Sequence, residues 1–369
     1  MKNYPNLFAA AGIPQAEIDK RIALAFHTIF EDETEKFYFD MGDGHGYMMD
    51  TGNFDARTEG MSYGMMMAVQ MDRKDIFDKL WLFSWDYMHQ TGGRYEGYFA
   101  WSVKPGGEKR NSEGPAPDGE EYYAMALFFA SSRWGDGEAP YDYSNQAKTI
   151  LRHCVHQSEM VEGGSPMWNP DNHYIKFIPE WEWSDPSYHL MHFYELFAEL
   201  ADERDAEFWK AAAKASREYL TISCDKNTGM APEYAMYDGS KELTRGHGNF
   251  YSDAYRVAMN IGLDAAWNGK TPALSAIADN LQNTLTRLAP DDDFHVYTTE
   301  GETLEEKALH PVAIIATTAA GSLAANGENA KEWVLKFWNT PLRKGDRRYY
   351  DNCLYFFCLL MLAGEFKIF

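Results

Sequence analysis

The sequence lacks any long apolar run. No stretch of about 18 apolar residues, the length that crosses a bilayer, occurs along the 369 residues. The first segment, "MKNYPNLFAAAGIPQAEIDK", has neither a sustained apolar core nor a convincing cleavage site. These two absences argue against a membrane protein and against secretion, so we expect a cytoplasmic location.

Cysteine is scarce as well. The four cysteines are Cys154, Cys224, Cys353 and Cys358, and their spacing fits no zinc site. Cys353 and Cys358 are five residues apart in an apolar segment that is typical of a helix, so they would not share a face. We therefore expect reduced, buried thiols.

Several catalytic and cofactor motifs are also missing. The sequence contains no P-loop and no G-x-S-x-G, and its closely spaced histidine pairs lack the H-E-x-x-H pattern of zinc enzymes. We expect neither a metal nor a cofactor.

Positive charge is in short supply. Lys and Arg number 34 against 56 Asp and Glu, which gives a formal net charge of −22. Such a field repels phosphate backbones and anionic lipids, so it argues against nucleic acid and membrane partners and favours a neutral or cationic substrate.

Aromatic residues, in contrast, are abundant. They make up 15% of the chain and include 11 Trp and 23 Tyr. Exposed Trp and Tyr rings stack on the flat faces of sugars, so this excess is a weak indication of a carbohydrate ligand. An aromatic core explains it equally well on composition alone.

Helical periodicity dominates, and long alternating strands are missing. We predict twelve helices near residues 16–30, 58–72, 74–90, 118–133, 142–158, 186–202, 204–221, 250–267, 272–288, 310–325, 329–339 and 349–364. Every second one, such as "MSYGMMMAVQM" and "YYDNCLYFFCLLMLAG", is apolar nearly all round, whereas the others carry a charged face. Six buried helices that alternate with six amphipathic ones predict an all-α fold, an (α/α)6 barrel with an inner and an outer ring, as a single domain over residues 1–369.

Each predicted inner helix begins with polar or aromatic side chains. In such a barrel the inner N-termini open on one face, so these side chains should converge on one cleft, near loops that hold Trp101, Trp168, Trp181 and Trp183. The groups concerned are Glu59, Asp118 with Glu120 and Glu121, Asp185 with Tyr188, Asp253 with Arg256, His310, and Tyr349 with Tyr350 and Asp351. Each one alone could equally be a helix cap.

Paired carboxylates in an aromatic cleft suit glycoside hydrolysis, in which one protonated acid and one ionised base act together. Glu59 is the candidate general acid. Asp253 is the candidate base, since Arg256 follows one helical turn later and can keep it ionised. Asp118 could bind a sugar, although a capping role after Pro117 is about as probable from the sequence.

Five blocks of the sequence resemble glycoside hydrolase family 8. They are "DTGNFDARTEGMSYGMMMAVQ", "PAPDGEEYYAMALFFASSRWG", "SDPSYHLMHFYELFA", "GNFYSDAYRVAMNIGLDAAW" and "RRYYDNCLYFFCLLMLAGEF". The resemblance spans nearly the whole chain, and it implies an (α/α)6 barrel that inverts anomeric configuration. It implies that Glu59 is the proton donor, that Asp253 activates water, and that Asp118 binds the sugar at the cleavage point. Trp101 corresponds to a sugar-stacking tryptophan, and Tyr188 and Arg256 correspond to residues around the base.

Within that family the chain looks closest to members that release xylose from the reducing end of xylo-oligosaccharides. Leu309, His310 and Pro311 match a kink that closes the leaving-group side of the cleft, where His310 could bind the free hydroxyl of the last sugar. Tyr349 and Tyr350 are further candidate substrate contacts. We expect a monomer that acts on neutral xylo-oligosaccharides of three or more sugars. The alternatives are an endo-acting xylanase, cellulase or chitosanase, and a catalytically inactive sugar-binding barrel.

Overall fold

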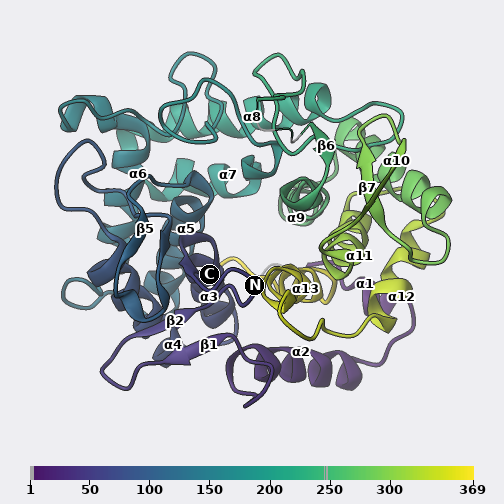
Figure 1. Ribbon diagram of the computed structural model, residues 1–369, viewed down its shortest axis with the longest axis horizontal. Coiled ribbons are helices and arrows are strands. Elements are labelled where there is room, and N and C mark those ends of the chain that lie inside the picture. Colours follow the sequence, from purple (N-terminus) through teal and green to yellow (C-terminus); the bar gives the residue numbers. More distant parts are fainter. Residues whose placement is uncertain (1–3, 245, 247) are drawn as a thin grey trace. The chain divides into compact units, whose positions relative to one another are not determined.

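The computed structural model describes residues 4–244, 246 and 248–369, and most of them lie in helices (Figure 1). The helices are α1 (Leu7–Ala10), α2 (Gln15–Phe30), α3 (Thr58–Gln70), α4 (Lys74–Phe83), α5 (Pro117–Trp134), α6 (Tyr143–Met160), α7 (Met191–Leu200), α8 (Ala206–Ser223), α9 (Arg256–Asn268), α10 (Pro272–Leu288), α11 (Pro311–Ala320), α12 (Ala330–Asn339) and α13 (Arg348–Leu362). Each of the twelve predicted helices therefore has a counterpart. Within the described part of the chain, no helix combines the length and apolar character needed to cross a membrane.

The predicted alternation of helix types is confirmed except at α7, which is fully buried only in its first half and leaves Glu199 exposed. In α3 every residue except Glu59 is buried, and in α13 the run from Tyr349 to Leu362 is buried without a break. The helices between the buried ones, such as α4 and α10, bury one face only. All four cysteines are buried thiols, as expected.

Eight short strands were not predicted. They form three antiparallel sheets: β1 (Tyr38–Asp40) with β2 (Gly46–Met48); β3 (Ala56–Arg57), β4 (Ser102–Val103) and β5 (Arg110–Ser112) in that order; and β6 (Asn249–Phe250), β7 (His295–Thr298) and β8 (Thr303–Lys307) in that order. Strands of two to five residues are too short to show a period of two in the sequence.

The starts of two predicted inner helices also differ from expectation. Residues Pro186–Tyr188 and Ser252–Tyr255 form 3₁₀ turns, and the α-helices begin only afterwards, at Met191 and Arg256. Tyr188 and Asp253 therefore sit on tight turns ahead of α7 and α9. The direction of these two side chains is therefore set by the 3₁₀ turns and not by an α-helix.

The chain divides into two compact units. Unit 1 contains the N-terminal segment up to Phe26, Glu182–His192 and Ala212–Phe366, and unit 2 contains His27–Trp181, Phe193–Ala211 and Lys367–Phe369. Glu59, Trp101 and Asp118 belong to unit 2, whereas Tyr188, Asp253, Arg256, His310, Tyr349 and Tyr350 belong to unit 1. A single domain over residues 1–369 stays a prediction.

Candidate active site

In unit 2, Glu59 is the one side chain of α3 that reaches toward solvent. It occupies the first turn of the helix, directly after β3, and it is half-buried while its neighbours Thr58 and Gly60 are buried. The apolar remainder of α3, which is rich in Met, packs beside α5 and fixes the helix in place (Figure 1). A carboxyl group in the first helical turn is in a favourable position beside the unpaired amide groups of the helix end.

Trp101 is tied to the start of α3 through the small sheet. Arg57 in β3 pairs with Ser102 in β4, and the amide of Thr58 donates a hydrogen bond to the carbonyl oxygen of Trp101 at 2.9 Å. The guanidinium group of Arg57 also lies over the Trp101 ring, 5.3 Å from its centroid. Glu59 and Trp101 are thus held in one local framework.

Asp118 lies in the first turn of α5, where the N-cap position belongs to Ala116. The capping role that the sequence left open for Asp118 is therefore wrong. A Cβ atom added to Gly119 would come within 2.5 Å of the Thr58 side chain, so this glycine lets the start of α5 approach the start of α3 closely. The first turns of α3 and α5, which carry Glu59 and Asp118, therefore lie side by side in unit 2.

Three residues that we expected at or near the predicted cleft lie in the core. Glu120 accepts a hydrogen bond from the Phe99 amide at 3.0 Å, and Glu121 accepts one from the Tyr194 hydroxyl at 2.9 Å, and both carboxyl groups are fully buried. Burial raises the pKa of Glu120 well above its usual value. Trp168 is 1% exposed and packs edge-to-face on Trp209, so it cannot offer a ring to a ligand.

In unit 1, Arg256 organises the group around Asp253. Its Nη2 atom lies 3.2 Å from Oδ1 of Asp253 and 3.9 Å from Oδ2 of Asp185, and its guanidinium group lies over the ring of Tyr188 at 5.5 Å. The Arg256 side chain is 3% exposed, whereas that of Asp253 is 23% exposed. Asp253 is therefore partly exposed to solvent, whereas the guanidinium group beside it is buried.

Two further carboxyl groups lie beside Asp253. Asp185 caps the 3₁₀ turn by accepting a hydrogen bond from the Ser187 amide, and Glu233 accepts one from the backbone amide of Asp253. Burial, with the charge of Asp253 in second place, raises the pKa of Asp185 well above its usual value and that of Glu233 to about 10. Both shifts favour the neutral carboxyl groups, and Asp253 is the carboxylate that lies closer to Arg256.

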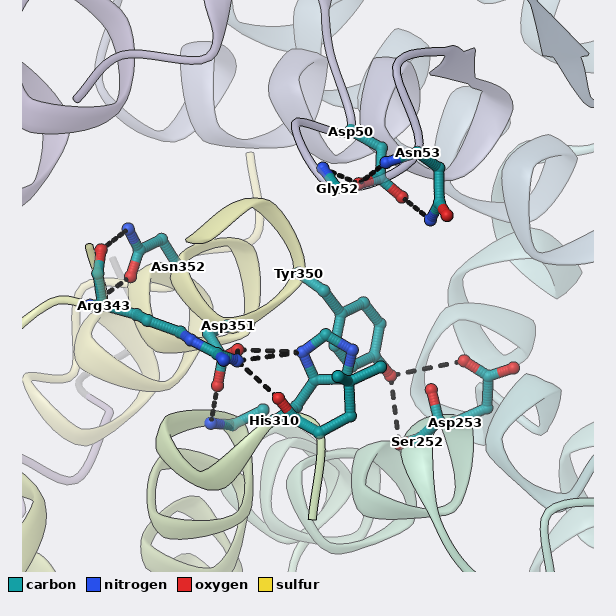
Figure 2. A network of polar contacts seen from close by, with 12 residues as sticks. Asp50, Gly52, Asn53, Ser252, Asp253, His310, Arg343, Tyr350, Asp351 and Asn352 are labelled. Atoms are coloured by element: carbon teal, nitrogen blue, oxygen red, sulfur yellow. Dashed lines mark hydrogen bonds and ion pairs between the residues drawn. The ribbon is translucent and has the colours of Figure 1, made fainter. Parts of the chain in front are cut away.

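The backbone next to Asp253 is strained. Ser252 has φ of 37°, in the left-handed region that residues with a side chain rarely adopt. Its carbonyl oxygen accepts a hydrogen bond from the Tyr350 hydroxyl at 3.2 Å, and the same hydroxyl lies 3.3 Å from Oδ1 of Asp253 (Figure 2). Tyr350 thus supports both the strained turn and the carboxylate that the turn presents.

His310 is held by a buried hydrogen bond to Asp351. Its Nδ1 lies 2.8 Å from Oδ2 of Asp351, and Asp351 also accepts hydrogen bonds from the Ala313 amide and the Arg343 guanidinium group (Figure 2). Because Asp351 acts as the acceptor in these contacts, Nδ1 of His310 carries the ring proton, and Nε2 is the atom that can meet a ligand.

The kink before α11 is also fixed by Arg343, which donates a hydrogen bond to the Leu309 carbonyl oxygen. Pro311 occupies the first helical position, as expected, and His310 precedes it with non-helical backbone angles. The His310 ring packs against Tyr350 with centroids 4.7 Å apart, and this contact joins the kink to the Asp253 group.

The structure therefore brings together Asp253, Arg256, Tyr188, Tyr350 and His310 in unit 1, and Glu59, Trp101 and Asp118 in unit 2. Tyr349 is almost fully buried, and its contact with substrate stays a prediction. Sequence reasoning missed Arg343 and Glu233, and it did not recognise Asp185 as a partner of Asp253. Glu233 and Asp185 come from distant segments without a helical spacing to Asp253, so no local signal relates them.

Comparison with known proteins extends these observations. A family model described as glycosyl hydrolases family 8 matches residues 26–364. A "reducing end xylose-releasing exo-oligoxylanase" of Halalkalibacterium halodurans is 57% identical over 370 residues, which cover 100% of this chain and 95% of the relative.

Solved structures agree with this result. A glutamate-to-alanine variant of a reducing-end-xylose releasing exo-oligoxylanase, complexed with xylobiose, is 56% identical with a TM-score of 0.97 over 99% of this chain and 97% of that one. Rex8A from Paenibacillus barcinonensis, complexed with xylose, is 54% identical with a TM-score of 0.96 over the same shares. Together with the alternating helices, these likenesses confirm the predicted fold class, an all-α (α/α)6 barrel.

Proposed function

Because the chain belongs to glycosyl hydrolases family 8, we propose that it releases xylose from the reducing end of short β-1,4-xylo-oligosaccharides with inversion of anomeric configuration. The observation that carries this proposal is the 57% identity, along the whole chain, to a relative with that activity in its name. Relatives that hold xylobiose or xylose support a neutral xylo-oligosaccharide as the substrate. A cytoplasmic location and a monomeric state stay predictions.

The acid in this proposal is Glu59. It donates its proton to the glycosidic oxygen as the bond to the leaving xylose breaks. The helix that carries Glu59 is held rigidly, because every other residue of α3 is buried. A fixed position matters because proton transfer needs the donor within hydrogen-bond reach of the oxygen.

The base is Asp253. It takes a proton from a water molecule whose oxygen attacks the anomeric carbon from the face opposite to the leaving group. Arg256 places a positive charge 3.2 Å from Asp253, and burial raises the pKa of Glu233 and of Asp185, which favours their neutral forms. The ring of Tyr188 lies beneath the guanidinium group of Arg256. We assign Tyr188 to the surroundings of the base and its water molecule.

Substrate length is set by the kink at Leu309, His310 and Pro311. A wall directly beyond the first leaving-side sugar leaves no room for a second one. The hydrogen bonds of Arg343 to the Leu309 carbonyl and to Asp351 make this wall rigid. Nε2 of His310 would bind the free hydroxyl of the reducing-end sugar, and an internal sugar without that hydroxyl would leave a polar group unpaired.

Xylotriose labelled at its reducing end tests the proposal. After brief digestion we expect the label in free xylose and almost no loss of viscosity from polymeric xylan. Label in xylobiose would show release from the non-reducing end, and rapid viscosity loss would show an endo-acting enzyme. Absence of any reducing-sugar release from a panel of neutral oligosaccharides would support an inactive sugar-binding barrel.

A further inference from the structure

Phe54 combines two features that do not stabilise the fold, an exposed side chain and a left-handed backbone conformation. Its side chain is 62% exposed, and its backbone has φ of 55°. A bulky residue is disfavoured in this left-handed region, and an exposed phenyl ring gains little from burial. Such a combination of strain and exposure at one residue suggests a selected role for the ring.

The turn that presents Phe54 is tightly closed. Asp50 Oδ1 accepts hydrogen bonds from the amides of Gly52 and Asn53 at 2.8 and 3.2 Å, and Oδ2 accepts one from the Asn53 side chain at 2.7 Å (Figure 2). The Phe54 amide donates to the Asp50 carbonyl oxygen at 2.7 Å, and the Asp50 amide donates to that of Asp55 at 2.8 Å. The exposed ring therefore stands on a backbone with little freedom to move.

The same turn is joined to Arg57, which directly precedes α3, the helix that carries Glu59. Arg57 lies 3.3 Å from Asp50 and 3.0 Å from Asp55, the two residues that flank the turn. Asp55 also accepts a hydrogen bond from the Ser102 hydroxyl at 2.7 Å. Since the Arg57 guanidinium group lies over Trp101, one cation connects the base of the Phe54 turn to the sugar-stacking tryptophan.

We propose that Phe54 stacks on a xylose ring on the non-reducing side of the scissile bond and so increases the preference for longer oligosaccharides. The proposal rests on the proposed function. If only one sugar fits beyond the scissile bond, every additional sugar of a longer substrate lies on the other side. Xylopyranose carries no exocyclic carbon, so its ring faces are flat enough to lie against a phenyl ring.

The strain at Phe54 provides a specific test. Replacing Phe54 by Ala removes the ring but keeps a Cβ in the left-handed conformation, whereas Phe54→Gly removes both. We expect kcat/KM for xylotetraose to fall about tenfold in each variant, the loss that a stacking contact accounts for, with the change mainly in KM. We expect Tm to be unchanged or higher in Phe54→Gly, and Phe54→Trp to restore the affinity.

Ile222→Ala is the matched control, because Ile222 is also an exposed apolar residue, on α8, and should keep the wild-type kcat/KM. Wild-type kcat/KM for xylotetraose in the Ala and Gly variants, while the wild-type enzyme releases reducing-end xylose, would overturn the assignment of Phe54 alone. A clear fall in Tm of Phe54→Gly would also overturn it, since the ring would then be structural. If the wild-type enzyme itself releases no reducing-end xylose, the proposed function fails and this inference fails with it.

Discussion

At the scale of single residues, the two candidate catalytic carboxyl groups have opposite surroundings. Glu59 is set on a nearly neutral, apolar helix, whereas Asp253 is next to Arg256 and two buried carboxyl groups. The sequence was sufficient to predict that Glu59 lies in the first turn of a buried helix and that Arg256, one turn after Asp253, lies beside it. The catalytic roles of Glu59 and Asp253 stay predictions. The sequence could not reveal Glu233, whose relation to Asp253 exists only after the loop before β6 has folded back.

Removal of either candidate catalytic carboxyl group should leave almost no hydrolysis. We expect Glu59→Ala and Asp253→Ala each to lower kcat on xylotriose by about 10²- to 10⁴-fold, the usual contribution of general acid or base catalysis. Circular dichroism and Tm should show a largely intact fold, since both side chains are partly exposed. Near-normal turnover in one variant would remove that residue from its assigned role.

Glu233 predicts a specific dependence of stability on pH. Its pKa of about 10 in the folded chain lies above that of an unfolded glutamate, so above pH 4.5 the folded state keeps a proton that the unfolded state has released. The contribution of Glu233 to stability is thus complete at low pH and declines as pH rises toward 10. Glu233→Gln should remove this decline.

Denaturant unfolding at several pH values measures this effect. We expect the advantage of Glu233→Gln over the wild type to grow from pH 5 to pH 9. Glu242→Gln is a control, because Glu242 is also buried in the same region. A constant difference between Glu233→Gln and wild type at all pH values would mean that Glu233 is ionised in the folded chain.

At the scale of secondary structure, the buried and amphipathic helices follow directly from the sequence. Met, Ala and aromatic runs such as those of α3 and α13 leave no polar face, and this pattern is strong over three or four turns. The 3₁₀ turns that carry Tyr188 and Asp253 could not be predicted, since three or four residues show no periodicity. The position of Asp253, the proposed base, therefore depends on features that only the structure supplies.

Arg343 should be essential for the kink before α11. Its removal leaves the fully buried carboxylate of Asp351 without its cation and the Leu309 carbonyl without its donor. We expect Arg343→Ala to lower the free energy of unfolding by about 3 kcal/mol and to weaken the restriction to one leaving-side sugar.

Lys344→Ala provides the comparison, because Lys344 is the exposed neighbouring cation. Urea unfolding and product analysis on xylohexaose should separate the two variants. We expect Lys344→Ala to keep the wild-type stability and to release xylose as the only early small product. Arg343→Ala should be less stable and should release xylobiose in addition. Identical products and stability in both variants would exclude Arg343 as the support of the kink.

At the scale of the whole molecule, the fold class could be predicted because twelve helices alternate in character along the chain. The single-domain prediction rests on the same alternation. Unit 1 consists of three separate segments of the chain, so it cannot form from one continuous stretch. We expect one cooperative transition in calorimetry, with equal calorimetric and van't Hoff enthalpies; two resolved transitions would show two domains.

The most direct test of the central claim is proton NMR of xylotriose during the first minutes of hydrolysis, before mutarotation. Cleavage at the reducing end creates the new anomeric centre on xylobiose, and inversion makes that centre α. We therefore predict an early excess of α-xylobiose without an excess of α-xylose. An early excess of α-xylose would place the cut at the non-reducing end, and an early excess of β-xylobiose would mean retention and contradict the role of Asp253 as the base.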